Sequence, residues 1–154
     1  MTDQTGWSVY GQGGLPDPDG DPQFYRGVAV KRLFAFLIDV IIVWGAALII
    51  GFLTLGVAFL IIGFVVFVID LMYRAISLSN SSATLGMAMV GIELRTYTGE
   101  RFNMGMALSH TILFYGMLMF IVVQLISVIM MGGGRYGRGL HDLILGSTMI
   151  NRPA

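Results

Sequence analysis

The chain has 154 residues, a formal net charge of 0, no cysteine and a mean hydropathy of +0.80. Apolar residues make up 56% of it and charged residues only 12%, about half the share found in a soluble domain. A chain this short has too little interior to bury that much apolar surface in water, so we expect it in a bilayer. The lack of cysteine excludes disulfide and thiolate metal sites. Nine basic against nine acidic residues give no electrostatic sign of nucleic-acid binding.

The first 25 residues differ in composition from the rest of the chain. They hold three of the four prolines, five glycines and no Lys or Arg. This composition is typical of a solvated segment that forms no packed core. Residues 1–25 are therefore predicted to form a disordered cytoplasmic tail.

Two long stretches, residues 40–69 and 102–134, contain no Asp, Glu, Lys or Arg. Each exceeds the roughly 20 residues that cross the hydrocarbon core of a bilayer. The first stretch, extended at both ends and broken by a glycine-containing turn, predicts spans at about 33–53 and 57–77. The second predicts a span at about 106–131. The sequence thus predicts an all-α membrane protein with about three transmembrane helices.

The remaining segments connect or follow these spans. In the loop of residues 79–105, weak alternation over 91–96 and the turn-forming Thr98-Gly99-Glu100 predict a short β-hairpin. Residues 132–154 are predicted to be a Gly/Arg-containing C-terminal tail. Its GGGRYG segment matches G-x-G-x-x-G, but the match follows a membrane helix rather than a strand, which argues against a dinucleotide site.

The Lys and Arg residues of the connections predict the orientation in the membrane. Six of the nine lie before the first span, at the end of the second or in the 79–105 loop, and three lie in the 132–154 tail. The positive-inside rule therefore places the N-terminus and the 79–105 loop in the cytoplasm. Three spans put the C-terminal tail on the far side, and no further apolar run supplies a fourth crossing.

Charged residues within the predicted spans are the main candidates for function. Asp39 lies seven residues into the first span, where a carboxylate costs about 2.5–3.5 kcal/mol on insertion scales. Arg32 lies on the same helix stripe, because seven residues bring an α-helix round to within about 20°. Two interpretations of Asp39 stay open: a structural polar contact with another helix, and a role in transport or ion binding.

Asp70 and Arg74 form an i,i+4 pair at the predicted cytoplasmic end of the second span. The first interpretation is a structural pair in which Arg74 reaches the membrane interface. The alternative is that Asp70 lies near the depth of Asp39, so that the two carboxylates share a proton or hold a cation.

Histidine and motif content weigh against an enzyme. His110, near the start of the third span, is interpreted as a hydrogen-bonded interfacial residue, with a proton relay as the alternative. The chain has one other histidine and no cysteine, so we expect no metal site and no cofactor. The sequence contains no P-loop, nucleophile elbow or HExxH motif, so we expect no enzymatic activity.

Three segments carry polar and small residues in a characteristic order. The segment KRLFAFLIDVII fits R-x-x-A-x-x-x-D through Arg32, Ala35 and Asp39. It is followed by SSATLGMAMVGIEL and then by GLHDLILGSTMI, which bring in the remaining matched residues: Thr84, Gly86, Gly91, His141, Asp142 and Gly146. Together these segments resemble the RDD family of small membrane proteins, named for one Arg and two Asp residues.

The resemblance covers about residues 25–150 and implies an RDD-type membrane domain over residues 26–150. It implies that the two named aspartates are Asp39 and Asp142. Met87 stands where the family usually has Lys, and His110 stands near where many members carry Arg. The family has been suggested to transport solutes or ions, but its biochemical role is otherwise undefined.

The leading hypothesis is transport of an ion or small solute by an integral, multi-pass protein of the cytoplasmic (plasma) membrane. Arg32, Asp39 and Asp142 would form the polar site, with Asp70, Arg74, His110 and His141 as secondary candidates. Three helices cannot enclose a solute path alone, so we expect a homo-oligomer or a membrane partner. The alternative is a noncatalytic membrane scaffold or assembly factor, in which the same residues only hold helices together and the tail docks a soluble partner.

Overall fold

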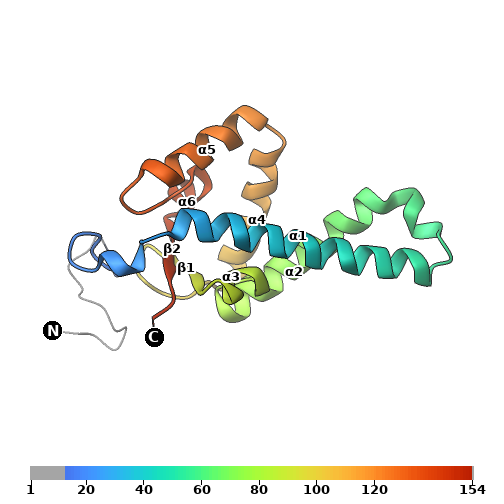
Figure 1. Ribbon diagram of the computed structural model, residues 1–154, viewed down its shortest axis with the longest axis horizontal. Coiled ribbons are helices and arrows are strands. Elements are labelled where there is room, and N and C mark those ends of the chain that lie inside the picture. Colours follow the sequence, from blue (N-terminus) through green and yellow to red (C-terminus); the bar gives the residue numbers. More distant parts are fainter. Residues whose placement is uncertain (1–12, 154) are drawn as a thin grey trace.

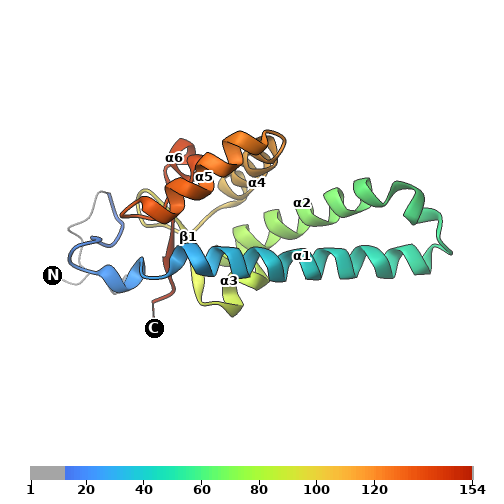
Figure 2. The ribbon, with the colours of Figure 1, turned by 45° about the horizontal axis from the view of Figure 1, so that its top comes forward.

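Two long helices form an antiparallel hairpin that extends away from the rest of the fold (Figures 1 and 2). The computed structural model describes residues 13–153. The first helix, α1, covers Val28–Leu53, and a turn with the 3-10 helix η2 (Val57–Ile61) leads into α2 (Ile62–Ser81). Both helices are long and apolar enough to cross a membrane, which confirms the first two predicted spans.

The far end of this hairpin exposes large apolar side chains. Leu53, Leu55 and Leu60 are 77%, 96% and 86% exposed. Surface of this kind is unfavourable in water and matches the hydrocarbon of a bilayer. The end of the hairpin near the η2 turn is therefore surrounded by lipid or by other membrane helices.

A two-stranded antiparallel sheet joins two distant parts of the chain. After the short helix α3 (Leu85–Met89), the strand β1 (Ile92–Thr96) pairs with β2 (Ser147–Asn151). The predicted strand and turn exist, since Thr96 N donates to Glu100 O at 3.0 Å and an isolated bridge joins Arg95 to Arg101. The main strand partner, however, lies in the segment predicted to be a C-terminal tail and not in the 79–105 loop.

The third predicted span is two helices rather than one straight helix. The pair α4 (Met104–Leu118) and α5 (Ile121–Gly133) is bent by 118° at a short break, and is either a broken span or a re-entrant loop. The charge-free run is longer than one crossing needs, so it can form two shorter helices. A hydropathy profile shows how apolar a segment is but not where its helix axis changes direction, so the sequence pattern does not predict the bend.

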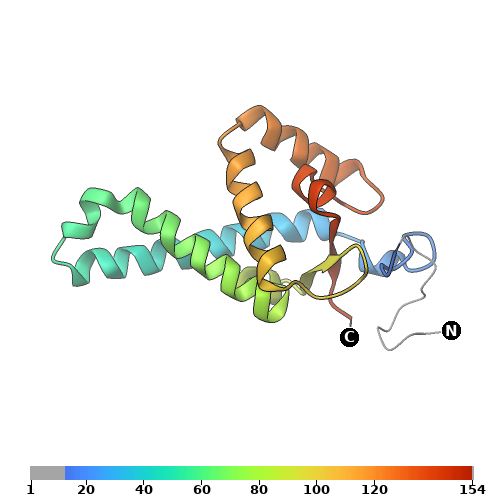
Figure 3. The same ribbon diagram turned by 180° about the vertical axis from the view of Figure 1, so that it is seen from behind.

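The chain after α5 returns to the end of the molecule where α4 begins (Figure 3). The short helix α6 (Leu140–Leu145) packs against both α4 and α5 and leads directly into β2. Since β2 pairs with β1, it lies on the same side of the fold as the connection between α2 and α4. The expectation that the C-terminal tail lies on the far side of the membrane depends on a straight third span, and α4 and α5 do not form one.

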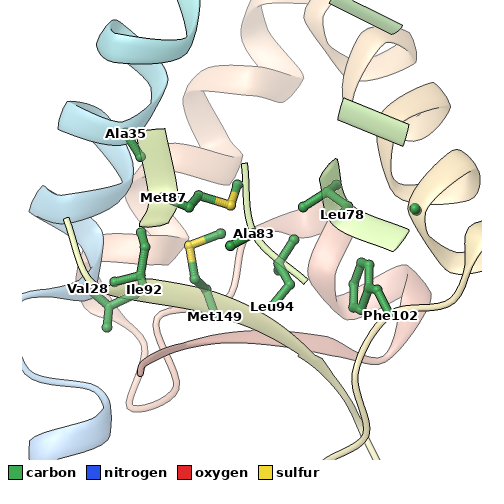
Figure 4. Packing of buried hydrophobic residues seen from close by; sticks show 10 residues of the cluster. Val28, Ala35, Leu78, Ala83, Met87, Ile92, Leu94, Phe102 and Met149 are labelled. Atoms are coloured by element: carbon green, nitrogen blue, oxygen red, sulfur yellow. The ribbon is translucent and has the colours of Figure 1, made fainter. Parts of the chain in front are cut away.

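The hydrophobic core lies where the helices meet the sheet (Figure 4). The side chains of Leu94 on β1 and Met149 on β2, which are register partners, are both buried in it. One cluster of ten buried residues links α1, α2, α3, the sheet and the start of α4: Val28, Ala35, Leu78, Ala83, Met87, Ile92, Leu94, Phe102, Ala107 and Met149.

Part of the predicted tail is folded against this core. Gly14 N donates to Tyr97 O at 3.1 Å, and Leu15 is fully buried. The Tyr25 hydroxyl, just after the 3-10 helix η1 (Pro22–Phe24), donates to Pro16 O at 2.8 Å. Residues 13–25 thus pack on the domain, whereas the rest of the predicted tail, residues 1–12, lies outside the described residues.

Candidate functional site

Asp39 is fully buried on α1 and accepts hydrogen bonds from two other elements. The Tyr73 hydroxyl of α2 donates to Oδ1 at 2.6 Å, and Gly86 N donates to the same oxygen at 2.9 Å. The Thr84 hydroxyl donates to Oδ2 at 2.7 Å and, as the N-cap of α3, accepts from Met87 N at 3.2 Å. This arrangement connects the start of α3 to the middle of α1 and keeps the carboxylate hydrogen-bonded away from water.

Arg74 lies between two carboxylates. Its Nε donates to the oxygens of Asp70 at 2.8 and 3.0 Å, and its Nη1 lies 3.8 Å from Asp39 Oδ2. The Tyr115 hydroxyl of α4 also donates to Asp70. The expected Asp70–Arg74 pair exists, and Arg74 is buried among protein side chains, at 8% exposed. Its charge is shared between the two aspartates.

Arg32 and Asp142 form a second buried ion pair, between α1 and α6. Arg32 Nη2 lies 2.5 Å from Asp142 Oδ2, which also accepts from Gly139 N at 3.0 Å. The other oxygen, Oδ1, accepts from the Ser147 hydroxyl at 3.1 Å. Burial alone would raise the pKa of Asp142, but the Arg32 guanidinium and the hydrogen bond with His110 outweigh it and hold that pKa below its ordinary value.

Both histidines of the chain lie beside Asp142. His110 Nε2 on α4 is 3.3 Å from Asp142 Oδ1, and His141 Nε2 is 3.7 Å from the same oxygen. The two imidazole rings are 4.8 Å apart, centroid to centroid. Burial is the largest influence on the pKa of His141 and outweighs the opposing effect of Asp142; with smaller contributions from His110 and Arg32, that pKa falls to about 4. The His141 imidazole is therefore neutral at pH 7.

The two groups of charged residues border one cavity of about 540 Å³ between α1, α4 and α5. This volume falls within the roughly 300–1,000 Å³ of small-molecule sites. Most of the wall is apolar, and the charged and histidine side chains that line it are Arg32, Asp39, Arg74, His110 and His141.

Several residues that line this cavity carry a buried polar atom without a protein partner. Among the described residues, four buried side-chain nitrogen or oxygen atoms lack a hydrogen bond, and three of them belong to residues that line the cavity. These are Arg32 Nη1, Gln124 Oε1 and His141 Nδ1. A buried polar group without a partner costs about 1–3 kcal/mol, so a shift of these side chains toward water or a ligand in the cavity would be stabilising.

The structure divides the predicted site of Arg32, Asp39 and Asp142. Arg32 and Asp142 are in direct contact, whereas Asp39 belongs to the group with Asp70 and Arg74. The sequence alone assigns no role to several side chains that complete these groups: Tyr73, Thr84, Tyr115 and Ser147. Thr84 and Gly86 had a signal in the SSATLGMAMVGIEL segment, and the others had none that a single sequence reveals.

Fold and site together define a helical integral membrane protein with paired charges buried beside a cavity. The family model described as the RDD family matches residues 26–146, most of the chain. The chain belongs to the RDD family. No curated protein and no solved structure was found to match it.

Proposed function

We propose that this protein binds a small amphipathic organic cation in the cavity between α1, α4 and α5, and carries it across the cytoplasmic membrane as an oligomer. The observation that carries the proposal is the charge of the buried groups around an apolar cavity. Two guanidinium groups, Arg32 and Arg74, face three carboxylates, those of Asp39, Asp70 and Asp142. Counting these guanidinium and carboxylate groups, one carboxylate is in excess, which favours a cation.

The form of the cavity supports an organic solute rather than a bare ion. A volume of about 540 Å³ corresponds to roughly 18 waters at ~30 Å³ each, far more than a single ion needs. Its walls include the rings of Phe36 and Phe114, and aromatic faces attract cations by about 0.5–2 kcal/mol. An apolar body with one positive group would fill such a space.

Asp39 is the carboxylate whose charge would act on the solute from within the cavity wall. The Arg32–Asp142 pair is closed, while Asp39 and Asp70 share the single charge of Arg74. Of these two aspartates, Asp39 lines the cavity. The excess negative charge is therefore available to a ligand through Asp39.

Transport by an oligomer follows from the depth of the cavity. Its lining residues on α1 run from Ala29 to Asp39, and on α2 they are Arg74 and Leu78. They therefore lie only in the half of the hairpin next to the sheet. The other half contributes no residue to this cavity and exposes apolar side chains, so a complete path needs a second copy of the chain.

The placement in the membrane supports the cytoplasmic side as the open end. No Lys or Arg occurs between Arg32 and Arg74 or between Arg101 and Arg135. If α4 and α5 form a re-entrant hairpin, all nine basic residues lie at one end of the α1–α2 hairpin. This distribution fits the positive-inside rule better than three straight spans, which divide them six to three. We place that end, with the sheet, in the cytoplasm.

Binding of tetraphenylphosphonium, a lipophilic organic cation, to the purified protein in proteoliposomes tests the proposal. Asp39→Asn keeps the size of the side chain but removes the excess charge. For charges about 8 Å apart at an effective dielectric constant of ~20, the lost attraction is about 2 kcal/mol, on the order of 30-fold in affinity. Asp19→Asn, at a carboxylate that is 73% exposed, is the matched control and should bind normally.

The same experiment separates transport from the scaffold alternative. That alternative is favoured by the complete hydrogen bonding of Asp39, and it predicts that Asp39→Asn lowers the melting temperature without any cation binding in the unmodified protein. Equal binding by the unmodified protein and Asp39→Asn would contradict the proposal. A strictly monomeric protein in native mass spectrometry would contradict the oligomeric path.

A further inference from the structure

The only two histidines of the chain meet at one carboxylate, although they are far apart in sequence. His110 on α4, His141 on α6 and Asp142 are all buried, and each offers a ligand atom within 4.8 Å of those of the other two. Two imidazoles and one carboxylate in this arrangement are typical of a site for a divalent transition metal. Counting histidines in the sequence does not reveal this cluster.

The two oxygens of Asp142 face different partners. Oδ2 accepts from Arg32 and from Gly139 N, which fix the orientation of the carboxylate. Oδ1 points to both imidazoles, at 3.3 Å from His110 Nε2 and 3.7 Å from His141 Nε2. Ligand atoms bound tetrahedrally at about 2.1 Å are about 3.4 Å apart. The two distances to Asp142 Oδ1 are close to this value, and the widest separation in the cluster, 4.8 Å, would have to shorten when an ion binds.

The environment of the two imidazoles is compatible with coordination. Both are buried, His110 at 7% and His141 at 4% exposed, so bulk solvent does not surround their ring nitrogens. Both histidines also line the cavity, so coordination positions not filled by protein would be open to water. The excess carboxylate around the cavity reduces the electrostatic cost of placing a cation there.

We propose that His110, His141 and Asp142 bind one divalent transition-metal ion of the Zn²⁺ or Co²⁺ type, with Arg32 as the outer partner that orients the carboxylate. Imidazole ligands favour such ions over Mg²⁺ or Ca²⁺, which take oxygen ligands. An outer hydrogen-bond donor on a ligating carboxylate is usual in metal sites. The proposal holds whether or not the cavity carries an organic solute.

Titration with Co²⁺ tests this site by visible absorption. The full chain is purified in detergent with a tag that contains no histidine and is stripped with EDTA. We expect one Co²⁺ per chain. His110→Gln and His141→Gln should each weaken binding by more than the roughly 10–100-fold that loss of an outer-shell partner costs. Glu100→Gln, at an exposed carboxylate, is the control and should bind as the unmodified chain does.

A measurement on the unmodified protein avoids any effect of the variants on folding. Pulsed electron paramagnetic resonance of bound Cu²⁺ counts coordinated imidazoles, and two imidazoles are expected. One imidazole or none would overturn the proposal. So would a lack of stoichiometric Co²⁺ binding, or binding that persists when both histidines are replaced by Gln.

Discussion

At the scale of single residues, this protein buries several charged side chains, and almost all of them have an ion-pair or hydrogen-bond partner. Asp39 accepts three hydrogen bonds, and Asp142 accepts from Arg32, Gly139 and Ser147. Removing one member of such a group leaves its partners buried and unsatisfied, which costs more than the group contributes as a whole. Conservative variants such as Asp to Asn are therefore the informative ones, since they keep the shape and part of the hydrogen bonding.

His141 predicts a pH dependence of stability. Burial lowers its pKa to about 4, from an ordinary value near 6.5, so in the metal-free folded protein it stays neutral where the unfolded chain binds a proton. Stability should fall by about 3 kcal/mol as the pH drops from about 6.5 to about 4, and this contribution is constant below that. The measurement is the melting temperature across this range in EDTA.

The His141→Gln variant provides the comparison for that measurement. The charged and titratable groups facing His141 are Asp142, His110 and Arg32. Asp142, whose pKa is lowered, loses its stabilising effect only as the pH falls below its unfolded value of about 3.8, so it acts in a lower window. A decline between pH 6.5 and 4 that is equally steep in His141→Gln would show that another group causes it.

At the scale of elements, the docking of α3 on α1 depends on a missing side chain. A Cβ at Gly86 would lie 2.3 Å from Ala35 O and 2.7 Å from Asp39 Oδ1. Helix backbones approach this closely only where a small residue stands between them. The position of Gly86 therefore allows its N–H to reach the Asp39 carboxylate.

Gly86→Ala should destabilise the protein by about 1–3 kcal/mol, because α3 must move away from α1 and its hydrogen bond to Asp39 is lost. The melting temperature in detergent measures the effect. Gly45→Ala is the matched control: it lies within α1, and a Cβ there meets nothing within 4 Å. That substitution should be neutral or stabilise by up to about 1 kcal/mol. Equal melting temperatures for the two variants would show that the close approach of α3 to α1 does not contribute to the stability of the protein.

The elements also show what a sequence pattern can and cannot predict. The lengths of α1 and α2 follow from hydropathy, because crossing a bilayer fixes how many apolar residues are needed. The bend between Leu118 and Ile121 does not, since every residue around it is apolar. The pairing of β1 with β2 is also hidden, because it depends on contacts between segments far apart in sequence.

The same reasons explain the outcome for the site. Arg32 and Asp39 could be singled out because a charge is unusual in an apolar run. Asp142 stands out only through the resemblance to the RDD family, because its short segment has the composition of a polar tail. Its contacts with His110 and Arg32 require the return of the chain after α5, which local pattern does not encode.

At the scale of the whole molecule, the pairing of β1 with β2 limits how α4 and α5 can lie in the membrane. β1 comes soon after α2, and β2 is the last secondary-structure element. Their pairing therefore keeps both strands at one end of the α1–α2 hairpin. A third complete crossing between them would separate the two strands by the thickness of the bilayer, about 30 Å. We therefore expect the bent pair α4–α5 to be a re-entrant hairpin that enters and leaves the membrane on the same side.

Cysteine accessibility tests this topology, and the cysteine-free chain suits it. Single cysteines at Val57, Thr98 and Arg135 probe the η2 turn, the loop after β1 and the segment after α5. With a membrane-impermeant thiol reagent, Val57→Cys should be labelled only from outside the cell. Thr98→Cys and Arg135→Cys should be labelled only in inverted vesicles, because the re-entrant hairpin leaves both on the cytoplasmic side. Labelling of Arg135→Cys from outside would instead require three complete spans, and it would separate Asp142 from Arg32 and so contradict both the cavity and the metal site.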